Sequence, residues 1–202
     1  DGLRFEHVCA EPVFAPEHLG APRGTIEDPR VVMMEGRCYM TFVHRRYVAT
    51  CRPTGVGVPR YSEATGVPAG ELNNYQSGIA VSDDMRRWRC LGMITPPTIH
   101  DRDNVLFPEK IGGRYVMLRR PNDYVGPKFG CSRPSIWISY SENLTDWTEP
   151  VLLATPRQEW EAAKIGAASP PVKTAQGWLT LYHGVDSSSR YRVGAMLLDA
   201  LD

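Results

Sequence analysis

Two carboxyl groups and a guanidinium stand within four consecutive residues, 27–30, directly before the apolar run 31–34. A carboxylic acid can donate a proton during catalysis, and the planar fork of an arginine can bind an oxyanion. Glu27, Asp28 and Arg30 therefore predict acid–base chemistry on a polar substrate, at the point where a strand enters a packed core. An aspartate before a proline is also a frequent turn residue, so a structural role for Glu27 and Asp28 stays open.

Charged and polar side chains recur at four other places where an apolar strand begins or ends. Two are strand beginnings, at 100–104 and 160–164, and two are strand ends, at 119–120 and 182–183. In a ring-shaped fold such positions converge on a central channel although they lie far apart in sequence. Their basic members would then bind an oxyanion next to an acid, although each alone could be a surface ion pair or a structural group. These basic members are Arg102, Arg120, Lys164 and His183.

A repeat in the chain indicates which elements would position these groups. The segments 29–42, 108–118 and 171–182 share one plan, in which a proline-led apolar stretch, a glycine-containing turn and an aromatic-rich strand predict a β-hairpin. An apolar strand, a polar turn and a tryptophan recur at 78–88 and 136–147. The pattern predicts an all-β repeat of roughly four strands per unit, a β-propeller. A β-sandwich whose hairpins resemble each other only in composition is the alternative.

The number of repeats bears on domain organisation. About three units fit into 202 residues, whereas a propeller usually closes with four to eight blades. We therefore expect residues 1–202 to form a single, partial propeller domain, with residues 193–198 as the third strand of an unfinished last unit. A long segment rich in proline and glycine, 44–77, interrupts one blade. Such an insertion is either a lid over the site or a surface excursion.

Composition excludes several classes of function. The 23 basic and 23 acidic residues give a formal net charge of +0, so we expect neither a nucleic-acid partner nor an anionic membrane surface. The five cysteines are odd in number and form no CxxC pair, which suggests neither a disulfide framework nor a zinc site, and no metal is expected. With no apolar window of membrane-spanning length, and if residue 1 is the native N-terminus, we expect a cytoplasmic protein.

Several blocks of the sequence together carry a resemblance to a known family. They occur at 27–30, 106–111, 120–121, 136–141, 160–167, 169–174, 177–178, 181–184 and 194–199. In content and order these blocks resemble the signature blocks of glycoside hydrolase family 130, the β-mannoside phosphorylases and related β-mannosidases. The resemblance covers the chain from about Glu27 to its end. It implies a five-bladed β-propeller, of which this chain would cover about three blades.

The resemblance also implies a reaction and roles for residues. In the family's phosphorylases, inorganic phosphate attacks the anomeric carbon of a β-mannoside with inversion and releases α-mannose 1-phosphate. Carried over by motif, Asp28 would be the general acid, acting through the 3-hydroxyl of the mannose. The implied phosphate ligands are Arg102, Arg120, Lys164 and His183, with Tyr191 near them. The expected sugar-binding residues are Glu27, Arg30, Trp160, Glu161 and Tyr182.

Alternatives within and outside this activity stay open. Hydrolytic members of the family lack much of the cationic set, so the presence of that set favours phosphorolysis, with phosphate as co-substrate and no other cofactor. The expected partners are a β-mannoside oligosaccharide and phosphate, and pairing with a second copy of the chain stays open. The rival hypotheses are an inverting β-mannoside hydrolase that uses water and a non-catalytic, mannoside-binding relic. The bases available to the hydrolase would be Glu109, Glu161 and Asp103.

Overall fold

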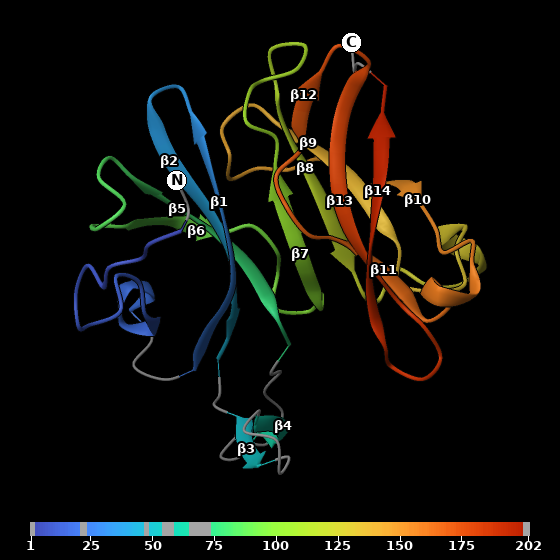
Figure 1. Ribbon diagram of the computed structural model, residues 1–202, viewed down its shortest axis with the longest axis horizontal. Helices are drawn as coiled ribbons and strands as arrows, with labels where there is room; N and C mark the ends of the chain where they lie inside the picture. The colour runs from blue at the N-terminus through green and yellow to red at the C-terminus, as the bar shows by residue number, and fades with distance from the viewer. Residues whose placement is uncertain (1–2, 21–23, 47–48, 54–58, 65–73, 200–202) are drawn as a thin grey trace.

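The computed structural model is an arrangement of β-sheets joined by turns (Figure 1). Its secondary structure also includes three short 3-10 turns, η1 (Pro16–Leu19), η2 (Pro127–Phe129) and η3 (Glu159–Glu161). Within the described part of the chain, no helix has the length and apolar character needed to cross a membrane. The structure describes residues 3–20, 24–46, 49–53, 59–64 and 74–199.

The first sheet is a four-stranded antiparallel meander in the order β1-β2-β5-β6. Its strands are β1 (Thr25–Met34), β2 (Arg37–Arg45), β5 (Gln76–Ser82) and β6 (Arg89–Met93). Strand β1 alternates buried Val32 and Met34 with exposed Val31 and Met33 near its end, which is the period of two expected when one face of a strand packs. The predicted hairpin at 29–42 is confirmed as β1–β2.

The second sheet repeats this plan in the order β10-β9-β8-β7, with β7 as the counterpart of β1. Its strands are β7 (Asp101–Leu106), β8 (Tyr115–Pro121), β9 (Ile136–Ser141) and β10 (Val151–Ala154). The predicted hairpin at 108–118 is only partly correct. Its first strand lies earlier, at β7, and residues 111–114 form the turn that leads into β8.

The third sheet is incomplete in the way that the repeat predicts. Its first strand is split: β11 (Lys164–Ala167) pairs with one half of β13 (Gly177–Val185), and β12 (Val172–Thr174) pairs with the other half. Strand β14 (Tyr191–Leu198) pairs with β13 on the far side and is the third strand of the unit. In Figure 1 the three sheets lie side by side, with β7 between β1 and β11. This is the arrangement of propeller blades.

Apolar side chains hold neighbouring blades together face to face. One buried cluster joins the first two sheets and includes Ile79, Leu106 and Met117. A second cluster joins the second and third sheets and includes Phe107 and Ile165. Strand β7 and its extension supply Leu106 to one cluster and Phe107 to the other, because successive residues of an extended chain point to opposite faces. The middle blade is therefore clamped on both faces, and its first strand is held rigidly between its neighbours.

The predicted insertion at 44–77 is shorter at both ends than expected. His44 pairs with Gln76 in the β2–β5 ladder, so these end residues belong to the blade itself. Between them, β3 (Ala49–Pro53) and β4 (Pro59–Ala64) pair as a separate antiparallel hairpin that projects from the end of the first sheet (Figure 1). The rest of the expected insertion, 47–48, 54–58 and 65–73, lies outside the described residues. The choice between a lid and a surface excursion stays a prediction.

The repeated tryptophans close the same turn in two blades. Asp84 Oδ1 and Asn143 Oδ1 each accept hydrogen bonds from the backbone N–H groups two and three residues ahead, at 2.8–3.1 Å. The indole N–H of Trp88 and of Trp147 then donates to the carbonyl oxygen three residues before it, at 3.0 and 2.9 Å. The predicted recurrence of tryptophan in register is thus confirmed down to individual hydrogen bonds.

We predict that Asn143→Ala lowers the free energy of unfolding by about 1 kcal/mol, because two backbone N–H groups of the turn lose their acceptor. For a domain of this size, that change lowers the melting temperature by roughly 2–4 °C. Asn143→Asp keeps the acceptor for these N–H groups, as Asp84 does in the first sheet. It should recover only part of the stability, because it places a carboxylate against Asp146, whose Oδ2 accepts from Asn143 Nδ2 at 2.7 Å. Thermal melts followed by circular dichroism test this, and an alanine variant as stable as the wild type would contradict it.

Candidate active site

Two neighbouring blades interrupt their first strand in the same way. The β1–β2 register shifts across Asp28, and the β7–β8 register shifts across Asp103. Both aspartates have a positive φ, 52° and 54°. Such backbone is uncommon outside glycine and tends to be found at functional sites, and a bulge of this kind re-aims a side chain. Each register shift places its aspartate carboxyl group on the wall of the same cavity.

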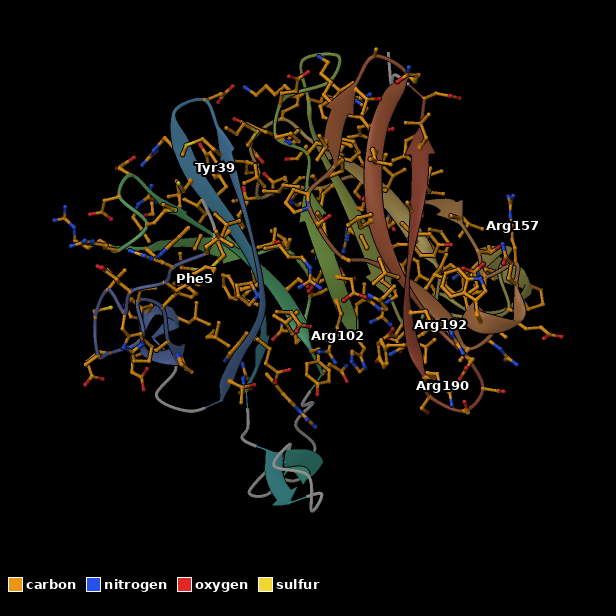
Figure 2. The ribbon with its side chains drawn as sticks, in the orientation of Figure 1. Phe5, Tyr39, Arg102, Arg157, Arg190 and Arg192 are labelled. Atoms are coloured by element: carbon orange, nitrogen blue, oxygen red, sulfur yellow. The ribbon has the colours of Figure 1, made fainter. Side chains whose placement is uncertain are left out.

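The cavity lies among the first strands of the blades and has a volume of about 250 Å³. Its lining comes from six strands and from all three sheets. In Figure 2, Arg102 lies toward the end of the strands from which the β3–β4 hairpin projects. A larger hollow of about 420 Å³ lies elsewhere, between the loops 130–133 and 155–162, but it gathers no comparable set of paired charges. The cavity is lined by Asp28, Arg30, Arg102, Asp103, Arg120, Lys164, His183 and Tyr191.

The carboxylate of Asp28 is engaged by Arg102. Arg102 Nη2 lies 2.8 Å from Asp28 Oδ2 and 3.5 Å from Glu27 Oε2. Arg30 holds the same turn from its other side, because its Nη1 donates to the backbone carbonyl of Asp28 at 2.7 Å. Burial alone would lower the pKa of Arg102, but the hydrogen bond and charge of Asp28 raise it above its ordinary value. Arg102 therefore stays protonated and places a positive charge directly beside the predicted acid.

Asp103 lies at the centre of the cluster and is nearly inaccessible to solvent, at 3% exposure. Its Oδ2 accepts a 2.5 Å hydrogen bond from Arg120 Nε and lies 3.4 Å from His183 Nε2, while its Oδ1 lies 3.5 Å from Arg30 Nη2. Burial alone would raise the pKa of Asp103, but the charge and hydrogen bond of Arg120, together with the charge of Arg30, bring it below its ordinary value. The group is therefore an ionised carboxylate that joins β7 to β1, β8 and β13.

His183 and Lys164 form the wall of the cavity on the third blade. Burial lowers the pKa of His183, and the neighbouring Arg120 and Lys164 lower it further, whereas Asp103 opposes them. The imidazole is therefore neutral at neutral pH and can donate one hydrogen bond to an anion. Lys164 Nζ lies 5.2 Å from the ring centre of Tyr191, whose ring also lies 5.5 Å from that of His183. Tyr191 thus packs against both cavity groups.

Gly166 permits the close approach of these side chains. It pairs with His183 across β11 and β13. A Cβ atom at this position would lie 2.0 Å from Asp103 Oδ2 and 2.8 Å from Arg120 Nε. Any larger residue would displace the ion pair from the cavity wall, so glycine is the residue that this site requires.

Tyr75 is a site residue that the sequence analysis missed. The guanidinium carbon of Arg102 lies 4.2 Å from the centre of the Tyr75 ring, and His100 stacks near it at 4.8 Å. Arg45 lies over the same ring at 4.9 Å, and its Nη1 donates to the phenolic oxygen at 3.2 Å. A single tyrosine after a segment rich in glycine and proline carries no local signal. Its position immediately before a repeated strand is the only available cue.

Three predicted sugar-binding residues lie on a different face of the third blade. Tyr182 precedes His183 on β13, so its side chain points away from the cavity. Its hydroxyl donates to Glu161 Oε2 at 2.9 Å, and burial together with Glu161 raises the pKa of Tyr182 to about 12. The Trp160 ring lies 5.8 Å from the Tyr182 ring. The structure does not bring Trp160, Glu161 and Tyr182 into the cavity, and their contact with a sugar stays a prediction.

The remaining predicted residues lie in or beside the cavity. Asp28, Arg30 and all five predicted phosphate ligands line it, and Glu27 adjoins it through Arg102. Asp103, named only as an alternative base, is at its centre. Glu109 lies elsewhere, where it pairs with Lys173 in an exposed ion pair. The structure thus brings together carboxyl groups and basic side chains from separate blades, which is the convergence that the repeat predicts.

We predict that Tyr75→Leu weakens the binding of inorganic phosphate roughly three- to tenfold, because Arg102 loses the aromatic face that supports its guanidinium. Tyr75→Phe keeps the ring and should bind phosphate nearly as the wild type does. Isothermal titration calorimetry measures both variants. Equal affinities for the leucine and phenylalanine variants would show that the ring does not position Arg102.

Comparisons with known proteins relate this chain to a family of carbohydrate-active proteins. Residues 68–202 match the family model described as β-1,4-mannooligosaccharide phosphorylase. A 1,2-β-oligomannan phosphorylase of Thermoanaerobacter sp. (strain X514) is 34% identical to the chain over 204 residues, which is 100% of this chain and 56% of that protein. A β-1,4-mannooligosaccharide phosphorylase of Ruminococcus albus is 37% identical over 126 residues, covering 60% of this chain and 36% of that protein.

A solved structure extends the comparison to the fold. The β-1,2-mannobiose phosphorylase from Listeria innocua, in complex with β-1,2-mannobiose, superposes with a TM-score of 0.70 at 28% identity, over 96% of this chain and 46% of that one. The fold is thus that of a five-bladed β-propeller, of which the present residues form about three blades. The chain spans about half the length of the curated relatives that it matches from end to end. With the family model and these relatives in agreement, the chain belongs to glycoside hydrolase family 130.

Proposed function

We propose that the protein containing this chain cleaves β-mannosides by inverting phosphorolysis, with inorganic phosphate as co-substrate, no other cofactor and α-mannose 1-phosphate as product. The observation that carries the proposal is the composition of the cavity, where the acid candidate Asp28 lies beside a group of cationic and hydrogen-donating side chains. The relatives named as mannoside phosphorylases support the substrate class.

The choice of phosphate over water rests on the charge of the cavity. An inverting hydrolase needs a second carboxylate that is free to deprotonate water, whereas phosphate is already an anionic nucleophile and needs cations to hold it. Arg102, Arg120 and Lys164 are suited to that task, and arginine can present two parallel N–H groups to an oxyanion. Asp103 is the alternative base that lies in the cavity, but it already accepts a hydrogen bond from Arg120. This favours phosphorolysis over hydrolysis.

Arg102 links phosphate binding to the position of the predicted acid. The Arg102 guanidinium lies against the Asp28 carboxylate at 2.8 Å. A bound phosphate dianion competes for the same guanidinium. We propose that Arg102 turns toward phosphate in the complex and leaves the Asp28 side chain free to face the leaving group.

Several features of the whole protein remain proposals of the same kind. Trp160, Glu161 and Tyr182 would contact the sugar only if the acceptor end of a mannoside extends beyond the cavity. Cys9, Cys38, Cys90 and Cys131 are free thiols, which fits a reducing cytoplasmic compartment. Pairing with a second copy of the chain is a further proposal, which the mass of the protein in solution tests.

The activity is tested by incubating the full-length protein with β-1,2- and β-1,4-mannosides, with and without phosphate. Release of α-mannose 1-phosphate that depends on phosphate supports the proposal. Mannose released equally well without phosphate would support the hydrolase instead. Retained mannoside binding with neither product would support a non-catalytic, mannoside-binding relic.

Asp28→Asn should lower kcat by at least about 100-fold, because the amide keeps the shape of the side chain but cannot donate the catalytic proton. The dissociation constant for the mannoside should change little. Asp83→Asn is the matched control, since Asp83 pairs with Arg37 at the surface, outside the cavity. Phosphorolysis rates together with sugar binding measure the effect, and substantial activity in Asp28→Asn would place the acid elsewhere.

Lys164→Gln should raise KM for phosphate roughly 10- to 100-fold, which corresponds to the loss of one hydrogen bond to a charged group. KM for the mannoside should change far less. Lys173→Gln removes a lysine that pairs with Glu109 in an exposed ion pair and serves as the control. Steady-state kinetics with each substrate varied in turn gives both constants. An equal increase in the two values would argue against a dedicated phosphate ligand.

A further inference from the structure

The cationic cavity contains a second carboxylate that the proposed chemistry does not use. Asp28 supplies the proton, and the basic groups hold phosphate, yet Asp103 also lines the wall. A carboxylate would be expected to weaken the binding of an anion, because like charges repel. Its place at the centre of an anion site therefore calls for a chemical reason beyond the pairing of charges.

The Asp103 carboxylate has hydrogen-bond acceptor sites that its neighbours do not use. Its Oδ2 takes the short hydrogen bond from Arg120 and faces His183. Its Oδ1 lies 3.5 Å from Arg30 Nη2, which is long for a hydrogen bond. An ionised carboxylate offers about four lone-pair sites and no donor. Asp103 can therefore accept a further hydrogen bond, but only from a ligand that carries a proton.

Oxyanions of similar size and shape differ in this respect. At neutral pH, inorganic phosphate carries at least one P–OH proton, and arsenate resembles it, whereas sulfate carries none. A carboxylate in the site can accept the P–OH hydrogen bond, but it can only repel sulfate. A site built for a hydrogen bond strongly rejects an analogue that cannot make it, because a buried polar group is then left unpaired.

We propose that Asp103 selects a protonated oxyanion, so that the cavity binds phosphate and arsenate and excludes sulfate. The proposal rests on the phosphorolysis proposed above and adds to it a residue that determines the choice of anion. Asp103 acts here by accepting the P–OH hydrogen bond through its free acceptor sites.

The surrounding charges are consistent with such a filter. Four side chains of the cavity, Arg30, Arg102, Arg120 and Lys164, are cationic, and without Asp103 they would favour any small dianion. Asp103 is also held in place rather than mobile. It lies within a register shift at a positive φ of 54°, and its Oδ2 accepts a hydrogen bond from Arg120 Nε at 2.5 Å. A carboxylate fixed in this way cannot swing aside to admit sulfate.

The test measures the binding of phosphate, arsenate and sulfate to the full-length protein by isothermal titration calorimetry, with sulfate also tested as an inhibitor of phosphorolysis. We expect the wild type to bind phosphate and arsenate at least about tenfold more tightly than sulfate. Asp103→Asn should lose at least roughly tenfold of this discrimination, because the amide keeps the shape while the negative charge is removed. Asp83→Asn, at the surface, should keep it.

Several outcomes would overturn the inference. Equal changes in phosphate and sulfate affinity in Asp103→Asn would show that the residue only holds Arg120 in place. Wild-type protein that binds sulfate as tightly as phosphate would overturn it without any variant, so the test survives a variant that fails to fold. If the wild type releases mannose 1-phosphate but Asp103→Asn still binds phosphate more tightly than sulfate by the wild-type factor, the inference alone fails. If the wild type binds no phosphate, the proposed function fails with it.

Discussion

The ion pair between Asp103 and Arg120 is the interaction on which the site depends most. It joins β7 to β8 within the middle blade and extends to β1 and β13 through Arg30 and His183. A buried charge is stable only when it is paired, so each member of this cluster constrains the others. The apolar clusters on both faces of the middle blade supply the rigidity that such pairing needs. The geometry of the site therefore depends directly on how the blades pack against each other.

Much of the fold was predictable because the chain repeats itself. The proline-led hairpins and the recurring tryptophans revealed the blade plan, and the unfinished third unit was visible in residues 193–198. The cavity was predictable for the same reason, since groups at equivalent positions of successive blades converge. Two details could not be seen in this way. The bounds of the insertion depended on the ladder that pairs His44 with Gln76, and the first strand of the second blade lay before the segment that looked like its hairpin.

The limits of prediction at the site follow from side-chain direction. Tyr182 and His183 are adjacent in sequence, yet alternation along β13 sends one away from the cavity and the other toward it. Tyr75 contacts Arg102 through its ring, and no sequence spacing encodes that contact. The importance of Asp103 was likewise hidden, because a register shift decides where its carboxylate points. Motifs locate charged groups along the chain, whereas bulges and strand alternation decide which of them meet.

The positive φ angles at Asp28 and Asp103 carry a consequence for how this protein would fail. Each such residue costs of order 1–3 kcal/mol, which only the surrounding structure can offset. The packing of adjacent blades thus offsets the backbone strain at these two site residues. Loosening that packing would let these two residues relax first, so function would decline before the β-sheets unfold. Ageing, heat or a distant core substitution would then produce a well-folded but inactive protein.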